Sequence, residues 1–324
     1  MGLVAQMYPS FFKNDARPFL ALISFTLNAF IGCWFLIQAD VFQNSGVVVV
    51  SDQDSYGRIV YKIQYNDFQL PGLLLRSAIV SLGLDHKIKT GEYQFERGDP
   101  VWSLFYRMIL GRVKQHSFRI IEGEDVFDIT QALRNNTHLA QGDVNLMEGS
   151  LLPDTYFFVK GDQPADLLAR AKKAQVEYLA DIWKDRDVGL PWQTLEEAII
   201  VASMLEKESK LIDERQKIAQ VILNRLQKNM RLQIDATAIY GLKNIQHVAY
   251  KHIKMKNELN TYQISGLPLH PICMPSRESL YAALHPRGEN DILYYVLMPD
   301  GRHHFSRTLQ EHGRMKEKMK NDSG

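Results

Sequence analysis

A stretch of 20 residues without a charged side chain, PFLALISFTLNAFIGCWFLI at 18–37, constrains this chain more than any other feature. As an α-helix with a rise of 1.5 Å per residue it would be about 30 Å long, the thickness of the hydrocarbon core of a bilayer. We therefore expect a transmembrane anchor at 18–38. Lys13 and Arg17 precede it, so the positive-inside rule keeps residues 1–17 in the cytoplasm and sends the rest across the membrane.

A cleaved signal peptide is the main alternative to this anchor, but no small-x-small cleavage site follows the apolar run. The sequence FIGC around Cys33 faintly resembles a lipoprotein processing box, yet residues 34–37 after it remain apolar where a soluble tether should begin. We expect an uncleaved single-pass anchor in the cytoplasmic (inner) membrane of a bacterium. The bulk of the chain then lies in the periplasm or outside the cell.

Composition limits the classes of function. The 38 basic and 37 acidic residues nearly cancel, so the basic surface typical of nucleic-acid binding is missing and we expect no nucleic-acid partner. Cys33 and Cys273 are the two cysteines, and the first lies in the predicted anchor. The exported part therefore has no disulfide and no cysteine-rich zinc site, and its stability depends on an ordinary core.

After the anchor, residues 45–115 have the pattern of a small α+β module. GVVVVS and RIVYKIQY within 46–65 are β-branched and aromatic runs, which predict two strands joined by a turn. A short helix is expected at 70–84. A strand carrying Tyr93 and Phe95 should follow.

That strand leads into a helix, in the segment YQFERGDPVWSLF. Asp99 is a good N-cap and Pro100 suits the first helical position, with Trp102 on the helix that follows. The segment resembles the peptidoglycan-binding LysM module, whose strand leads through a Gly-Asp turn into a Trp-containing helix. A plain spacer that holds the next domain off the membrane explains the pattern equally well.

Residues 118–324 are predicted to form a second, mainly α domain with short strands, so the fold class of the whole chain is α+β. One helix should begin at the N-cap Thr194, because Glu197 three residues later completes a capping box. This helix is apolar on nearly every side, which is typical of a helix at the centre of a domain. Helices are expected at 165–185, 194–209, 213–228 and 276–285, and strands at 118–121, 292–298 and 302–306.

The central helix ends in LEKES at 205–209, which contains two glutamates of different character. If the helix continues one more turn, the neighbours of Glu206 are small and polar, whereas those of Glu208 are apolar and include Leu211 and Ile212. An apolar site raises the pKa of a carboxyl group. Glu208 is then suited to donate a proton to the leaving oxygen of a sugar, although a buried glutamate is more often satisfied by an arginine or a backbone amide.

Six sequence blocks identify a family resemblance. They are EGSLLPDTYFF (148–158), ASMLEKES (202–209), ERQKIAQVILNRL (214–226), MRLQIDATAIYGL (230–242), LNTYQISGLPLHPICMPSRESLYAALHP (259–286) and HHFSRTLQEH (303–312). In this order and spacing they resemble the YceG-like family, the membrane-anchored endolytic murein transglycosylases called MltG. The resemblance runs from the anchor to the C-terminus, and it implies that 118–324 is the catalytic domain.

The resemblance implies an enzyme that cuts nascent peptidoglycan glycan strands at the β-1,4 bond from N-acetylmuramic acid to N-acetylglucosamine. It places the catalytic acid on Glu208. Such an acid protonates the leaving oxygen and then, as the carboxylate, takes the proton of the C6 hydroxyl group, which closes a 1,6-anhydro ring without water. No cofactor is implied, and peptidoglycan synthases are candidate partners.

The resemblance also implies a glycan groove lined by polar and aromatic residues, although Asn and Asp also cap turns and Tyr is often a core residue. Ala236 departs from the family, which usually has Pro there. Glu148 and Asp154 belong to a block that we expect to shape the domain. The candidates for substrate binding are Gln233, Asp235, Thr237, Tyr240, Asn260 and Tyr262.

Two other functions stay open. A hydrolytic muramidase would use the same acid with Asp235 or Asp154 to activate water. A non-catalytic scaffold would bind glycan through the LysM-like module and would not need Glu208. Metal chemistry is not expected, because no H-E-x-x-H motif occurs and the adjacent histidines His303 and His304 would point apart on a strand.

Overall fold

The structure is a computed structural model that describes residues 26, 41–65, 80, 83, 85–242, 245 and 248–322. Apart from Thr26, the predicted anchor lies outside these residues, as does most of the helix predicted at 70–84. Within the described part, no helix is long and apolar enough to cross a bilayer. The chain divides into two compact units, Met1–Gln115 and His116–Gly324.

The first unit contains a two-stranded antiparallel sheet. Strand β1 (Gly46–Val50) pairs with β2 (Gly91–Phe95), with Val48 opposite Tyr93. The 3₁₀ turn η1 (Asp85–Lys87) precedes β2. The strands pack on helices α2 (Tyr56–Gln64) and α4 (Val101–Leu110), which share one core with them.

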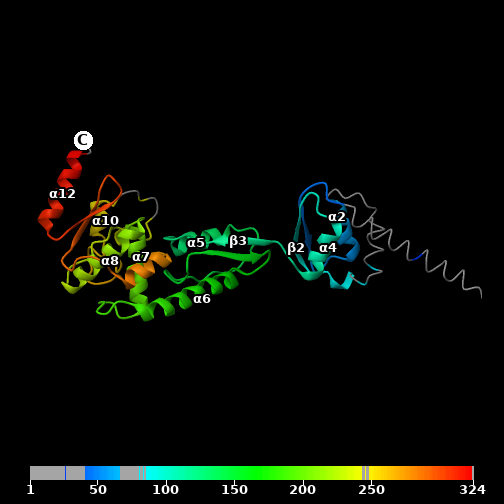
Figure 1. Cartoon of the computed structure of the whole chain (residues 1–324), viewed down its shortest axis with the longest axis horizontal. Coiled ribbons are helices and arrows are strands. Elements are labelled where there is room, and N and C mark those ends of the chain that lie inside the picture. Colours follow the sequence, from blue (N-terminus) through cyan, green and yellow to red (C-terminus); the bar gives the residue numbers. More distant parts are fainter. Residues whose placement is uncertain are drawn as a thin grey trace, which may run out of the picture. The chain divides into compact units, whose positions relative to one another are not determined.

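The prediction of a second strand within 56–65 is wrong, because these residues form α2 (Figure 1). The Ser55 side chain accepts a hydrogen bond from the Arg58 amide and caps the helix. Ile59 and Ile63, four residues apart, then fall on one buried face. The helical spacing of the segment therefore outweighs the strand preference of its β-branched residues. Strand β1 pairs instead with β2, some 40 residues later in the chain.

The start of α4 is shifted by one residue from the prediction. Pro100 is the N-cap, and no side chain caps the helix. Asp99 instead accepts a hydrogen bond from the Glu96 amide at 3.1 Å and pairs with Arg107 at 2.5 Å. Trp102 stands at the protein surface, 36% exposed.

Strand β3 (Gln115–Arg119) runs from the last residue of the first unit into the second, where it forms a two-stranded sheet with β4 (Thr155–Val159). Helices α5 (Val126–Arg134) and α6 (Pro164–Ile182) pack against this sheet and share its core. The 3₁₀ turn η2 (Trp183–Asp185) follows α6.

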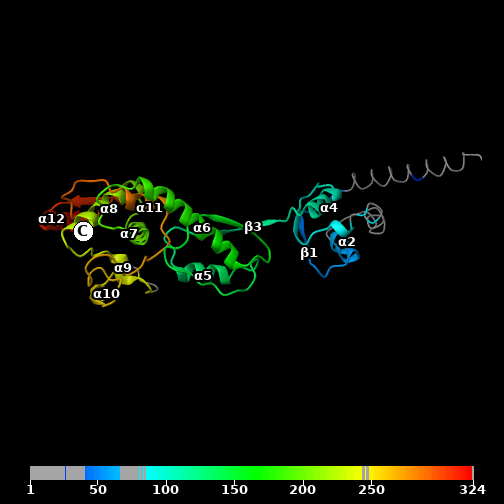
Figure 2. The ribbon, with the colours of Figure 1, turned by 90° about the horizontal axis from the view of Figure 1, so that it is seen from below.

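The larger core of the second unit surrounds α7 (Leu195–Glu208). This helix packs on α8 (Ile212–Gln227) and α11 (Arg277–Leu284), and the three helices lie side by side in Figures 1 and 2. The predicted capping box of α7 is confirmed, because Thr194 and Glu197 exchange side-chain to backbone hydrogen bonds. Seven of its residues are buried, as expected for a central helix.

Short elements complete the second unit. Helix α9 (Asp235–Ile239) contacts α7 and α10 (Tyr250–Lys254). Strands β5 (Tyr294–Leu297) and β6 (His303–Ser306) form an antiparallel hairpin on which α12 (Leu309–Asp322) packs. The described chain is therefore mostly helical with short two-stranded sheets, which agrees with the predicted α+β class.

Candidate active site

The last turn of α7 carries both glutamates of LEKES. The helix ends at Glu208, and Ser209 is extended, with φ −134° and ψ 133°. The further helical turn, on which the neighbours Leu211 and Ile212 depended, therefore does not form. Ile212 is 59% exposed, so it does not provide the apolar surroundings expected for Glu208.

Glu206 is a structural residue. Its two oxygens accept hydrogen bonds from both terminal nitrogens of Arg215, at 2.8 and 3.1 Å. Oε2 also accepts from the amide and the hydroxyl group of Ser276, the N-cap of α11. The two charged side chains are almost fully buried, at 6% and 8% exposure. Glu206 therefore fastens α7 to the starts of α8 and α11.

Glu208 has a different environment. Its Oε2 accepts a hydrogen bond from the phenol of Tyr295 at 2.9 Å. Burial raises the pKa of Glu208 to about 7, and the negative charge of Asp235 acts in the same direction. The Tyr295 hydrogen bond and the positive charge of Arg225 oppose this shift. Near neutral pH both the acid and the carboxylate forms of this carboxyl group are therefore accessible, as a proton-transferring group requires.

The sequence did not predict Tyr295 as a partner of the acid. It lies in β5, opposite Phe305 of β6, and 87 residues separate it from Glu208. Only the hairpin register and the packing of the hairpin on the helices bring the two together. The sequence did predict a strand at this position, but a strand alone does not say which side chain meets the acid.

Asp235 and Tyr262 form a hydrogen-bonded pair near Glu208. The phenol of Tyr262 donates to Oδ1 of Asp235 at 2.6 Å. Asp235 is the first residue of α9 and is exposed. Burial is the main cause that raises the pKa of Tyr262, and the hydrogen bond to Asp235 is the second. The negative charge of Glu208 raises this pKa as well. Of the six predicted substrate-binding residues, these two are the ones whose charges and hydrogen bonds connect them with the acid.

Arg225 of α8 supplies the positive charge in this region. Its Nε donates to the Leu293 carbonyl at 2.7 Å, and Nη1 donates to the Leu232 carbonyl at 2.6 Å. Its guanidinium also lies over the ring of Tyr294, 5.4 Å from the centroid. Arg225 thus holds the loop before α9 and the strand β5 in place, while its charge lowers the pKa of Glu208.

Three predicted residues shape the loops around this pair. Thr237 is buried, donates to the Ile234 carbonyl and shares a hydrogen bond with Thr261. Asn260 is fully buried, and its amide nitrogen donates to three backbone carbonyls. Gln233 is exposed and has a left-handed backbone, with φ 53°. The side chains of Thr237 and Asn260 thus make hydrogen bonds within the protein.

Tyr240 belongs to another cluster. Its phenol donates to Oε1 of Glu148 at 2.7 Å, and the same oxygen accepts from the Val126 amide. The ring of His270 lies against Tyr240 with centroids 5.6 Å apart. Burial raises the pKa of both Glu148 and Tyr240. Glu148 thus links the start of α5 to the end of α9, in line with the role expected for its block in shaping the domain.

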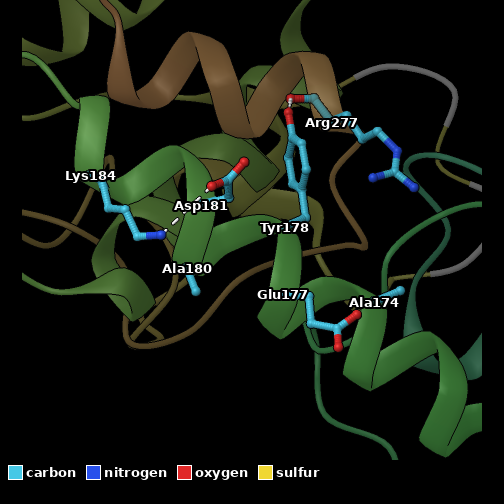
Figure 3. A pocket seen from close by; sticks show the side chains of 7 residues that line it. All are labelled: Ala174, Glu177, Tyr178, Ala180, Asp181, Lys184 and Arg277. Carbon is cyan, nitrogen blue, oxygen red and sulfur yellow. Dashed lines mark hydrogen bonds and ion pairs between the residues drawn. The ribbon is translucent and has the colours of Figure 1, made fainter.

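Two surface hollows lie elsewhere in the second unit. One, of about 580 Å³, is lined mainly by α6, and in it the Tyr178 hydroxyl group donates to the Arg277 carbonyl at 3.1 Å (Figure 3). The other, of about 240 Å³, shares Arg277 and includes Asp154, whose carboxylate pairs with that arginine at 3.1 Å. Glu208 lines neither of these two hollows.

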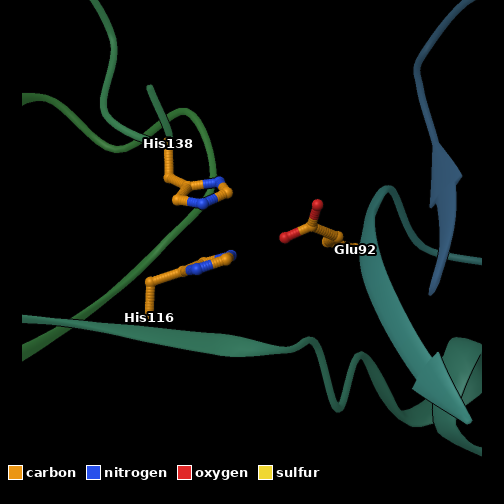
Figure 4. Close-up of side chains that lie close together, drawn as sticks. All are labelled: Glu92, His116 and His138. Carbon is orange, nitrogen blue, oxygen red and sulfur yellow. The ribbon is translucent and has the colours of Figure 1, made fainter. Parts of the chain in front are cut away.

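Five histidines of the second unit lie in two different places, two of them at the β3 sheet and three on or beside the hairpin. His116 of β3 stacks on His138 with ring centroids 3.9 Å apart (Figure 4). His303 is bound to Glu214 at 2.7 Å, His304 is exposed, and His312 stacks on Tyr294. Successive residues of β6 thus point apart, as the sequence predicted for His303 and His304.

Fold and site together define a mostly helical α+β protein with one partly buried acid at the end of its central helix. Residues 48–318 match the YceG-like family, and the chain belongs to that family, as its six sequence blocks predicted. The chain is similar to an endolytic murein transglycosylase of Bacillus subtilis (strain 168), with 34% identity over 173 residues. The match covers 53% of this chain and 48% of that protein.

Another relative is an endolytic murein transglycosylase of Streptococcus pneumoniae serotype 2 (strain D39), 24% identical over 178 residues. That match covers 52% of this chain and 31% of the relative, so the chain spans half or less of the curated relatives it matches. A crystal structure of a YceG-like protein from Listeria monocytogenes aligns with a TM-score of 0.55 and 22% identity, over 84% of this chain and 99% of that one. This last likeness concerns the fold.

Proposed function

We propose that this protein is a lytic transglycosylase that cuts peptidoglycan glycan strands internally, with Glu208 as its catalytic acid. Family membership and the names of its relatives support the substrate class. The observation that carries the proposal is Glu208, a carboxyl group whose pKa is raised to about 7 by burial at the end of the central helix. A second carboxylate, which ordinary glycosidases need, is not required by this chemistry.

In the proposed reaction Glu208 donates its proton to the glycosidic oxygen between N-acetylmuramic acid and N-acetylglucosamine. The carboxylate then removes the proton from the C6 hydroxyl group of the muramic acid, whose oxygen attacks the anomeric carbon and closes the 1,6-anhydro ring. A pKa near the working pH suits both steps, because the same group must first give a proton and then take one. Asp235 and Tyr262 are proposed to bind sugar hydroxyl groups beside the acid.

The rest of the chain would bring this site to its substrate. We place the second unit outside the cytoplasm, tethered by the anchor predicted at 18–38, where nascent strands are made. The module at 45–115 would then hold glycan near the membrane. Peptidoglycan synthases remain proposed partners.

A hydrolytic muramidase is the second candidate, and one observation favours it. The charge of Asp235 acts on Glu208, and in this mechanism Asp235 would be the base that activates a water molecule. The two candidates differ in their product. Transglycosylation leaves a 1,6-anhydro end, whereas hydrolysis leaves a reducing end.

The test is mass spectrometry of purified glycan strands digested by the full chain in detergent. Glu208→Gln is compared with Glu196→Gln, which removes an exposed carboxylate from the first turn of the same helix. Anhydro ends from the wild type and from Glu196→Gln, but not from Glu208→Gln, are expected. Reducing ends would instead establish hydrolysis. Cleavage by Glu208→Gln would refute the assigned acid, and no cleavage by the wild type would leave the scaffold function.

A further inference from the structure

The hydrogen bond between Tyr295 and Glu208 distinguishes the two oxygens of the acid. Oε2 accepts from the tyrosine phenol at 2.9 Å. Accepting a hydrogen bond from the Tyr295 phenol makes Oε2 the less suitable oxygen for the acid proton. The geometry points to Tyr295 as a positioning residue that directs the acid proton of Glu208 to Oε1 and stabilises the carboxylate after that proton has left. This inference rests on the proposed function.

The ring of Tyr295 packs against His303 of the neighbouring strand β6. The ring of His303 meets its ring edge to face, with centroids 5.5 Å apart and planes at 83°. Nδ1 of His303 is 2.7 Å from Oε2 of Glu214, and both side chains are nearly buried, at 6% and 4% exposure. The hairpin therefore cannot release Tyr295 without disturbing a buried polar pair, which is costly.

The same Glu214 reaches the end of α7. One of its oxygens accepts from the amide of His303 at 3.0 Å, and the other accepts from the hydroxyl group of Ser209 at 3.3 Å. Ser209 directly follows Glu208 and caps its helix. Glu214 thus joins the helix end that carries the acid to β6, the hairpin strand that pairs with the strand of Tyr295. This link helps to hold Tyr295 and Glu208 at hydrogen-bonding distance.

Tyr295 differs from the other charged and titratable groups around the acid, because its hydroxyl group donates a hydrogen bond directly to the Glu208 carboxylate. Asp235 of α9 disfavours the carboxylate by its charge, Arg225 of α8 favours it, and the Tyr262 phenol is bound to Asp235. Burial keeps the pKa of Tyr295 well above its usual value, so the phenol stays protonated and can only donate to the carboxylate. A donor stabilises the charged form of the acid over the neutral form.

The proton path is balanced without any further reactant. The proton on Oε1 moves to the glycosidic oxygen as the bond from that oxygen to the anomeric carbon breaks, and the bonding electrons leave with the oxygen. Glu208 is then a carboxylate, with the Tyr295 hydroxyl group still on Oε2. Oε1 next takes the proton of the C6 hydroxyl group, whose oxygen bonds to the anomeric carbon. Tyr295 keeps its own proton throughout.

The test compares Tyr295→Phe with the wild type and with Tyr294→Phe, a change of the same size at the neighbouring position of β5. Because one hydrogen bond to a charged group is lost, kcat should fall about tenfold to a hundredfold in Tyr295→Phe while KM stays nearly constant. The alkaline limb of the pH profile should move to higher pH, because the carboxylate has lost a stabilising donor. Tyr294→Phe should match the wild type.

A second variant guards against misfolding of the first. 3-Fluorotyrosine at position 295 keeps the ring and the hydroxyl group but is a stronger donor, so it should move the alkaline limb to lower pH. Infrared titration of the full chain, with Glu208→Gln as the blank, follows the Glu208 carboxyl band directly. Opposite shifts of this band in the two variants support the inference.

Unchanged kcat and an unchanged Glu208 titration in Tyr295→Phe would overturn the role of Tyr295 while leaving the acid assigned. An equal loss of kcat in Tyr294→Phe would also overturn it, because any change in the strand would then have the same effect. If the wild type cuts no glycan, the proposed function fails instead. The infrared titration still separates that result from a failure of the hydrogen bond.

Discussion

Replacing the catalytic candidate should make the protein more stable at alkaline pH. Glu208→Gln keeps the shape of the side chain and an oxygen that accepts from Tyr295, but it removes the charge that burial disfavours. The folded protein raises the pKa of Glu208 from its usual value of 4.5 to about 7. Between these two values the folded state binds more protons than the unfolded state, so stability falls as the pH rises through this window.

The magnitude follows from the size of the shift. A pKa raised from 4.5 to about 7 corresponds to a loss of stability of about 3 kcal/mol at pH 8 and less than about 1 kcal/mol at pH 5. The glutamine variant does not titrate and escapes this penalty. For a unit of about 200 residues, about 3 kcal/mol corresponds to a rise in Tm of about 6–12 °C at pH 8.

Differential scanning calorimetry of the full chain at pH 5 and pH 8 measures this effect on the transition of the second unit. Glu206→Gln is the matched control, because it changes the other carboxyl group of the same turn. It leaves the buried Arg215 without its charged partner and should destabilise the unit by about 3–5 kcal/mol at both pH values. A Tm of Glu208→Gln that exceeds the wild type equally at pH 5 and pH 8, or not at all, would refute the assignment of a raised pKa to Glu208.

The remaining predictions concern the loops around the site. Asn260→Ala leaves three backbone carbonyls without their donor, and should lower the free energy of unfolding by about 3 kcal/mol in urea titrations; a loss below about 0.5 kcal/mol would contradict this. Gly149→Ala places a Cβ 2.5 Å from Ile199 and 2.8 Å from Pro271 at φ +70°, and should cost about 2 kcal/mol or more by the same assay. A Gly149→Ala variant as stable as the wild type would contradict this prediction, because it would show that the loop accommodates the added Cβ.

Much of the helical core could be predicted from the sequence, because local signals and burial agree there. The capping box at Thr194 and the apolar surface of α7 identify its start and its central position. In 56–65 they disagree, since β-branched residues favour a strand while the spacing of Ile59 and Ile63 favours a helix. The Ser55 cap and the core of the first unit decide for the helix, and neither effect follows from residue preferences alone.

The distinction between the two glutamates shows what local sequence cannot provide. The sequence correctly indicated a raised pKa for Glu208. It attributed the apolar surroundings to Met204 and Leu205, which are buried on α7, and to Leu211 and Ile212, in a helical turn that does not form. Burial in the folded protein is the main cause of the raised pKa, and the groups that adjust it, Tyr295 downward and Asp235 upward, come from other elements. Interactions over 27 and 87 residues depend on how the hairpin and α9 pack, and one sequence carries no direct record of that packing.

The end of α7 at Glu208 has an electrostatic consequence of its own. The aligned peptide dipoles of a helix leave about half a negative charge at its C-terminus. The acid is the last residue of a 14-residue helix, so this partial charge disfavours its carboxylate form. In two-carboxylate enzymes a neighbouring acidic side chain provides such repulsion. Here the backbone contributes part of it, and no substitution of a side chain can remove that contribution while the helix ends at this residue.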